Sequence, residues 1–365
     1  MNPHEKYVFL SSWGFFRILM KIDKVTLLLI FSAFIMASCG NKGKAKDDLA
    51  DTGRTKRTEA LLCNLDSIAA KGFLVGQQDA TLYGIGWEGD SARSDIKSIC
   101  SESPAVVGFE IGGIEMGSKT NLNGITFDTI RRAVLAQYDC GGVCLLSWHV
   151  RKTPSTDQID RLCDFLNTLE EPYGVRVPVI LRPCSDGLNA QFWQTLHERF
   201  EYKDVVNALL AYTISPLSTR SDASGKQAPD LKEMMEHIDL LGIEQFDLSK
   251  SADKDTMGVY SKQLDESLSS IEKMGKEYSK PVAIFATGAE SVPYESWFTE
   301  VLLPVLDKHK FAFILFGRND NRQPGHFFVP FPGHPAASDF TRFANSPRTI
   351  FLRNANGMYI SRGEN

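Results

Sequence analysis

The sequence predicts one α/β domain folded as a (β/α)8 TIM barrel, a single catalytic-type domain. Short apolar runs typical of buried strands alternate along the chain with longer amphipathic stretches typical of helices. Strand then helix, repeated, indicates parallel strands, and eight such units in roughly 300 residues suit this barrel. A doubly wound open sheet is the alternative, but no G-x-G-x-x-G pattern follows the first predicted strand.

The elements follow one another in a regular order. The eight predicted strands cover about 73–75, 105–109, 143–147, 177–181, 209–212, 238–243, 282–285 and 311–316. The clearest helical patterns between them cover 127–137, 156–169, 257–278 and 296–308. Some have Asp or Ser at the start and Lys near the end, which are helix boundary signals. In this barrel the functional groups lie where strands end and loops begin, so the residues after each strand are the candidates for chemistry.

The N-terminus has the pattern of a targeting segment. Lys21 and Lys24 precede an apolar run over 25–36, which is too short for a comfortable transmembrane helix. The sequence Met36-Ala37-Ser38-Cys39 resembles the lipobox of bacterial lipoproteins. This resemblance implies cleavage before Cys39 and diacylation of that cysteine.

These features give a domain plan. We expect a signal peptide over 1–38, with Met20 as a plausible true start, and a tether over 39–57. The tether is polar, with almost nothing apolar to bury, and should be flexible. A barrel over 58–355 and a tail over 356–365 complete the chain. The anchor predicts a cell-envelope location at the outer membrane, and the sequence leaves open whether the protein faces the periplasm or the outside.

Charge and cysteine content limit the possible partners. The formal net charge is −5 and the basic residues are scattered, so nucleic acid is a poor ligand. The spacing of Cys140 and Cys144 has no second close pair and no nearby His, so no metal is expected. Cys184 is a weak candidate nucleophile, because the nearest His in sequence, His197, lies in a helical stretch. P-loop, G-x-S-x-G and H-E-x-x-H patterns are absent, and no cofactor is expected.

The predicted rim of the barrel mixes aromatic, acidic, amide and basic side chains. Aromatic rings stack on the C–H faces of sugars, while forked donors and acceptors bind hydroxyl groups, so this mixture suits a polyhydroxylated ligand. A buried Trp or His near a strand end is often only packing, and it is the whole set that supports a ligand. The set comprises Gln77, Gln78, Asp79, Glu110, Trp148, His149, Arg182, Asp186, Tyr212, Glu244, Ala286, Arg318 and Asn319.

Several segments together resemble glycoside hydrolase family 26, which includes β-mannanases. The similar segments are 76–79, 83–87, 94–97, 104–110, 147–149, 324–334 and 337–340. The resemblance extends from about Leu61 to Leu352, which is nearly the whole predicted barrel. It implies a retaining mechanism, with one glutamate as acid/base after the fourth strand and another as nucleophile at the end of the seventh.

The sequence departs from the family pattern at both catalytic positions. The family's Arg-Pro-aromatic-His-Glu is matched by Arg182 to Asp186, so the acid/base position holds the shorter Asp186. The family's Glu-Thr-Gly is matched by Ala286-Thr287-Gly288, so Ala286 stands at the nucleophile position. The supporting histidine is replaced by Ser185, and the tryptophan that usually precedes Arg-Asn after the eighth strand is replaced by Gly317.

The resemblance therefore implies a non-catalytic binder of β-mannan or a related hemicellulose, with an outer-membrane glycan-utilisation complex as a candidate partner. Its binding residues would be Glu110, Trp148, His149, Arg182, Tyr212, Glu244 and Arg318. The alternative is an active glycosidase with a relocated carboxylate pair such as Asp186 and Glu244, spaced to hold a water. Glu290, four residues beyond Ala286, is a weaker replacement. A structural barrel whose cleft binds nothing is a third possibility.

Overall fold

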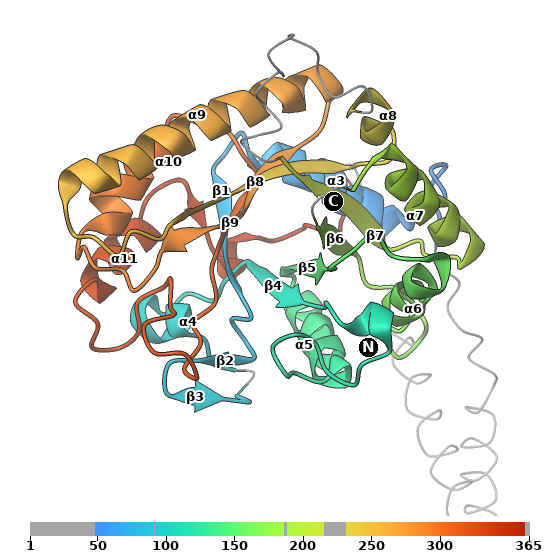
Figure 1. Cartoon of the computed structure of the whole chain (residues 1–365), viewed down its shortest axis with the longest axis horizontal. Coiled ribbons are helices and arrows are strands. Elements are labelled where there is room, and N and C mark those ends of the chain that lie inside the picture. Colours follow the sequence, from blue (N-terminus) through green and yellow to red (C-terminus); the bar gives the residue numbers. More distant parts are fainter. Residues whose placement is uncertain (1–47, 91, 186–187, 215–230, 362–365) are drawn as a thin grey trace, which may run out of the picture. The chain divides into compact units, whose positions relative to one another are not determined.

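The computed structural model describes residues 48–90, 92–185, 188–214 and 231–361, and these form a closed parallel barrel (Figure 1). Its strands are β1 (Phe73–Gln78), β4 (Val106–Glu110), β5 (Val143–His149), β6 (Val179–Cys184), β7 (Ala208–Thr213), β8 (Leu240–Asp247), β9 (Val282–Ala289) and β10 (Phe313–Phe316). Each strand pairs in parallel with the next, and β10 closes the ring on β1 between Leu74↔Phe313 and Gln77↔Phe316. The barrel prediction is confirmed, and closure excludes the open sheet.

The helices surround the barrel on its outside (Figure 1). The longer ones are α3 (Lys56–Ile68), α5 (Phe127–Asp139), α6 (Thr156–Leu166), α7 (Ala190–Tyr202), α9 (Lys254–Tyr278) and α11 (Ala337–Ala344). The shorter ones are α4 (Asp95–Cys100), α8 (Leu231–Met235) and α10 (Leu303–Leu306). Side-chain caps explain several starts: the side chains of Thr126, Asn189 and Asp253 each accept a hydrogen bond from a first-turn backbone N–H, which satisfies an otherwise unpaired donor.

Small elements complete the barrel. A two-stranded hairpin of β2 (Tyr83–Gly84) and β3 (Trp87–Glu88) follows β1, and β11 (Thr349–Ile350) pairs with the start of β1. Single 3-10 turns are η1 (Ile114–Met116) and η3 (Leu352–Asn354). The helix predicted over 296–308 is instead a π-helix, η2 (Trp297–Leu302), that continues into α10.

Strand alternation divides the core into two layers. Inside the barrel lie Leu74, Val106, Leu145, Ile180, Leu209, Leu240, Phe285 and Phe313, and between barrel and helices lie Phe73, Val107, Leu146, Leu181, Leu210, Leu241, Ile284 and Ile314. Phe285 fills the barrel interior beside Gly242, where an added Cβ would stand 2.1 Å from the Phe285 ring. Glycine is therefore needed at residue 242 for close packing.

The domain begins earlier and ends later than the sequence predicts. Helix α3 starts at Lys56, and Arg54 already forms an ion pair of 2.7 Å with Asp239. At the other end, the Tyr359 ring packs on Tyr138 with centroids 4.7 Å apart. Where the sequence predicts a tether, Arg54 and Thr55 contact the barrel domain, and where it predicts a tail, the backbone carbonyls of Gly357, Met358 and Ile360 accept hydrogen bonds from Asn64 of α3. The predicted signal peptide, Met20 and Cys39 lie outside the described residues.

Within the part of the chain that the structure describes, none of the helices has the length and apolar character needed to cross a membrane.

Candidate functional site

The strand ends bring most of the predicted rim residues to one mouth of the barrel. Glu110, His149 and Cys184 end the three neighbouring strands β4, β5 and β6. Glu244 and Ala286 lie near the ends of β8 and β9. Because all eight strands of the closed ring are parallel, these carboxyl ends share one edge, as expected for a barrel of this kind.

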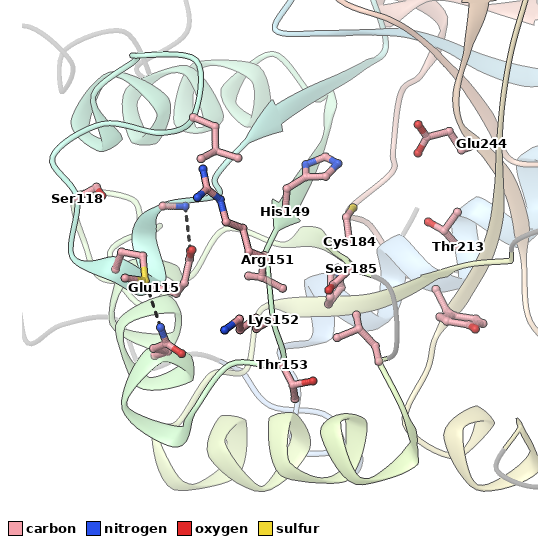
Figure 2. A pocket seen from close by; sticks show the side chains of 18 residues that line it. Glu115, Ser118, His149, Arg151, Lys152, Thr153, Cys184, Ser185, Thr213 and Glu244 are labelled. Atoms are coloured by element: carbon pink, nitrogen blue, oxygen red, sulfur yellow. Dashed lines mark hydrogen bonds between the residues drawn. The ribbon is translucent and has the colours of Figure 1, made fainter.

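A cavity of about 1310 Å³ opens at this mouth, over the ends of β5 to β8. Figure 2 shows His149, Cys184 and Ser185 between a side that carries Glu115 and Ser118 and a side that carries Glu244 and Thr213. The full lining comprises Gly113, Glu115, Met116, Ser118, Leu122, His149, Val150, Arg151, Lys152, Thr153, Gln158, Pro183, Cys184, Ser185, Leu188, Tyr212, Thr213 and Glu244. The cavity therefore offers both charged and apolar contacts.

Glu110 and His149 form a hydrogen-bonded pair beside the cavity. The Glu110 carboxylate is buried, accepts a 2.6 Å hydrogen bond from the Gly112 N–H through Oε1, and contacts His149 Nδ1 through Oε2. Hydrogen bonds to Cys184 and to Glu110 raise the pKa of His149 to about 10, although burial lowers it. His149 is thus an imidazolium at neutral pH, with its ring half-exposed to the cavity.

Trp148 lies inside the core rather than on the cavity surface. Its side chain is 0 % exposed, and its Nε1–H donates a 3.0 Å hydrogen bond to Glu115 Oε2. Glu115 itself is buried and also accepts from the Gly113 N–H at 2.9 Å. Trp148 is therefore not available to contact a ligand, in contrast to the sequence-based expectation. Its ring instead supports the wall of the cavity that carries Glu115.

Arg182 and Glu244 form an ion pair across the barrel mouth. Arg182 is 4 % exposed and its Nη1 donates to Glu244 Oε2 at 3.1 Å. Burial lowers the pKa of Arg182, but the charges of Cys184, Glu244 and Glu110 outweigh it and raise that pKa overall. Among the described residues, the buried Arg182 Nε has no hydrogen-bond partner. Glu244 is the member of the pair that a ligand in the cavity can reach.

A bulge in β9 sets the direction of Ala286. Ile243 pairs with Ile284, but Glu244 pairs with Ala286, so Phe285 is an extra residue in β9. A bulge of this kind re-aims the side chains that follow it. Glu244 is therefore the carboxylate directly across from Ala286. Glu290 lies further along and is held by His326 and Lys250, each at 3.1 Å.

Phe328 occupies the space beside Gly317. A Cβ at Gly317 would stand 2.4 Å from Phe328 Cδ2, and one at Gly288 would stand 2.9 Å from Phe328 Cβ. Phe328 is buried and its ring lies 4.9 Å from that of Phe246. The space beside Gly317 is thus filled by a phenylalanine from a later loop, which the sequence pattern did not indicate.

Arg318 and Asn319 have different surroundings. Asn319 is buried and structural: its Nδ2 donates to Asp95 Oδ2 at 2.7 Å, and its Oδ1 accepts from the Phe328 and Val329 N–H groups. Arg318 is partly exposed, with its Nε 3.7 Å from Asp320 Oδ2. Arg318, like Ala286, is not among the described residues that line the cavity, so its binding role stays a prediction.

The remaining predicted residues are placed as follows. Tyr212 lines the cavity, and its half-buried ring packs edge-on against Trp193, with centroids 5.8 Å apart. Asp79 is buried, and burial raises its pKa from its usual value near 3.8 to about 6. Gln77 and Gln78 end β1. Asp186 lies outside the described residues.

Other residues of the site were missed from the sequence. Met116 and Leu122 are exposed apolar side chains at the edge of the cavity, and Arg151 and Lys152 add positive charge. They come from the loops after β4 and β5, which have no periodic pattern. Only their position shortly after predicted strands could have marked them as rim residues.

Comparison with solved structures gives consistent matches. The chain is similar to a β-mannanase of glycoside hydrolase family 26 from Bacteroides ovatus, with 32% identity, 86% of this chain and 99% of that chain covered, and a TM-score of 0.76. A family 26 protein from Muricauda sp. matches at 21% identity, 84% and 94% coverage and TM-score 0.69. A Cellulomonas fimi endo-β-1,4-mannanase matches at 22% identity, 85% and 79% coverage and TM-score 0.69. No protein-family model and no curated protein matches the chain.

Proposed function

This chain belongs to glycoside hydrolase family 26, and from that membership we propose that it binds a β-mannan or a related hemicellulose without cleaving it. The observation that carries the proposal is a cavity with polar and charged side chains in its lining, at a barrel mouth where Ala286 of β9 is the register partner of Glu244. A retaining glycosidase needs a carboxylate that attacks the anomeric carbon, and a methyl group cannot do so.

The acid/base position supports the same proposal. Asp186 is one methylene shorter than glutamate, which displaces its proton by about 1 Å and can cost on the order of 100-fold in rate. General acid catalysis is itself worth about 100- to 10,000-fold. A weakened acid and an absent nucleophile together leave only the binding functions of the cleft.

The cavity supplies the contacts that a neutral sugar needs. Glu244 and the His149 imidazolium offer charged hydrogen-bonding groups at its surface, and charge-assisted hydrogen bonds are about twice as strong as neutral ones. Tyr212, Met116 and Leu122 offer apolar contacts. Mannan is the ligand class we favour, because the matched protein of 32% identity is a β-mannanase.

The proposed location is the bacterial outer membrane. The lipobox-like sequence that ends at Cys39 supports a lipid anchor, and a polar segment before the barrel would hold the cleft away from the lipid surface. A glycan-utilisation complex there would use such a protein to capture polysaccharide. Loss of membrane association in a Cys39→Ala variant would support the anchor, and unchanged fractionation with the membrane would contradict it.

Calorimetric titration with mannohexaose, glucomannan and xylohexaose tests the binding function. We expect saturable heat with the first two, and no heat with any ligand would contradict the proposal. A Tyr212→Ala variant should weaken binding about fivefold or more, since a lost aromatic contact costs roughly 1 kcal/mol. Tyr202→Ala is the matched control, because Tyr202 is 74% exposed on α7 and does not line the cavity.

The second candidate function, hydrolysis by a relocated pair, rests on the position of Glu244 opposite Ala286. A reducing-sugar assay on the same glycans tests it. Release of sugar by the unmodified chain that disappears in an Asp186→Asn, Glu244→Gln double variant would establish that pair. Release that persists in the double variant would exclude these two residues.

A further inference from the structure

A thiol, an imidazole and a carboxylate lie in one row across the barrel mouth. Cys184 on β6 is the register partner of His149 on β5, and Figure 2 shows the two side chains beside each other at the cavity. His149 Nδ1 is bound to Glu110, which ends β4. A carboxylate that orients a histidine beside a thiol is the arrangement that activates cysteine as a nucleophile.

The surroundings of Cys184 are electropositive. Cys184 and Glu110 both raise the pKa of His149, the register partner of Cys184, and the Glu110 carboxylate contacts the imidazole at Nδ1. The buried Arg182 guanidinium also interacts with Cys184, and its Nε lacks a hydrogen-bond partner among the described residues. Cationic neighbours stabilise a thiolate, which is the reactive form of cysteine. When protonated, the thiol donates to the Arg182 carbonyl oxygen, 3.3 Å away.

Access to the thiol comes from the cavity. Cys184 is half-buried and lines it, whereas Cys144 and Cys163 are buried in the core. Cys63 and Cys140 are more exposed than Cys184, but neither lines the cavity within the described residues. The cavity of about 1310 Å³ is large enough for a small reagent to reach the sulfur.

We propose that Cys184 is a nucleophilic thiol and a covalent modification site at the barrel mouth, with the His149 imidazolium as its cationic partner and proton donor, Glu110 as the positioning residue, and small disulfides as its reactants. The proton that the thiol loses is held on the His149 imidazolium, and Cys184 attacks as the thiolate of this ion pair. The thiolate attacks one sulfur of the disulfide, a new S–S bond forms, and the old S–S bond breaks. The departing thiolate takes the proton from His149, so one thiol is released for each mixed disulfide formed.

This proposal goes beyond glycan binding and stands without it. If both hold, a mixed disulfide at Cys184 occupies the cavity and blocks the glycan. Modification of Cys184 is measured without any sugar present. A negative result in that experiment is therefore distinguishable from a negative result in the glycan-binding experiment.

The pH dependence of the reaction depends on every charged group that faces Cys184. On the strands these are His149 from β5, Glu110 from β4 through His149, Arg182 from β6 itself, and Glu244 from β8 through Arg182. From the loops, Glu115, Arg151 and Lys152 line the same cavity. Tyr212 from β7 also lines the cavity, and burial raises the pKa of its phenol, so it stays neutral. The raised pKa of His149 keeps the imidazolium, the cation on the strand beside Cys184, present at neutral pH.

The test is the rate of modification of each cysteine in the full chain by 2-hydroxyethyl disulfide and by iodoacetamide at pH 6.5, read by peptide mass spectrometry. A thiol of ordinary pKa is only about 1% thiolate at this pH. We expect Cys184 to react at least about tenfold faster than Cys63 and Cys140, although it is less exposed. A Cys184 rate at or below theirs would overturn the proposal.

Variants separate activation from simple access. His149→Ala should slow Cys184 about tenfold or more, and Glu110→Gln should slow it less, because the ring keeps its nitrogen but loses its carboxylate. Thr153→Ala is the control, since Thr153 lines the same cavity and should leave the rate unchanged. An unchanged rate in a folded His149→Ala protein, checked by circular dichroism, would also contradict the role of His149. If that variant unfolds, the ranking of cysteines in the unmodified chain still decides.

Discussion

At the scale of single residues, Ala286 is the residue on which the proposed function depends most. The β9 bulge directs it toward the face that carries Glu244, and Glu244 is already paired with Arg182 at 3.1 Å. A carboxylate restored at residue 286 would therefore meet an existing ion pair. Two carboxylates that share one site raise each other's pKa, which weakens the new group as a nucleophile.

We predict that Ala286→Glu combined with Asp186→Glu restores little hydrolysis. Gly317 and Ser185 remain, and Phe328 occupies the space beside Gly317, so the reacting sugar lacks its support. Sugar release by the double variant should stay near that of Ala286→Gln, which has the same shape without the charge. Robust turnover, measured as reducing ends released from mannan, would instead show that the rest of the site is intact.

Asp79 gives a second prediction at this scale. Its folded-state pKa is about 6 and its usual value is 3.8, so the folded protein binds a proton more tightly than the unfolded chain. The stability contributed by that proton is present below about pH 4 and is lost as the pH rises through 6. The full change is roughly 3 kcal/mol.

An Asp79→Asn variant should lack this loss. The free energy of unfolding of the variant minus that of the unmodified chain should rise between pH 4 and pH 7, as measured by urea denaturation at each pH. The difference cancels groups that titrate alike in both proteins, such as His334, whose pKa burial lowers. A pH-independent difference would mean that Asp79 titrates alike in the folded and unfolded chains.

At the scale of elements, the barrel strands could be predicted from the sequence. The start of the π-helix η2 could not, because it depends on a distant side chain. Buried apolar runs identify strands without knowledge of their neighbours, and all eight predicted barrel strands are present with ends shifted by a few residues. The π-helix η2 depends on Asp339, which accepts hydrogen bonds from the Phe298 and Thr299 N–H groups at 2.8 and 3.1 Å. A contact made by a residue some 40 positions away has no local signal.

The residues of the candidate site also include some that the sequence could place and others that it could not. The sequence could place Glu110, His149 and Glu244 at strand ends, since strand position alone decides that. It could not show that Trp148 turns into the core, because the partner that holds it, Glu115, is 33 residues away. It also did not pair Cys184 with His149, because sequence distance hides the register of neighbouring strands.

Close packing beside β10 gives a prediction with a matched control. Gly317→Ala places a Cβ 2.4 Å from Phe328 Cδ2, so we expect a loss of about 1–3 kcal/mol in the free energy of unfolding. Gly258→Ala, on α9 with open space around it, should instead stabilise by about 0.5–1 kcal/mol, because alanine favours helix. Denaturant midpoints compare the two, and a stabilising Gly317→Ala would show that Phe328 moves freely.

At the scale of the whole molecule, a family 26 barrel carries a cavity at the carboxyl ends of its strands. The closed parallel ring depends on apolar residues in two layers, none of which takes part in catalysis. A change of side chain at a strand end, such as the one proposed at Ala286, is therefore compatible with the same fold. The same scaffold can then serve for capture of a glycan or for thiol chemistry, because function resides in the site rather than the fold.

One calorimetric titration of the chain with mannohexaose tests the central claim most directly, since it reports binding and turnover together. We predict injection heats that saturate and a baseline that returns to its starting power after each injection, which is reversible binding without cleavage. A sustained displacement of the baseline, the heat of continuing hydrolysis, would contradict the account, and so would the absence of any heat.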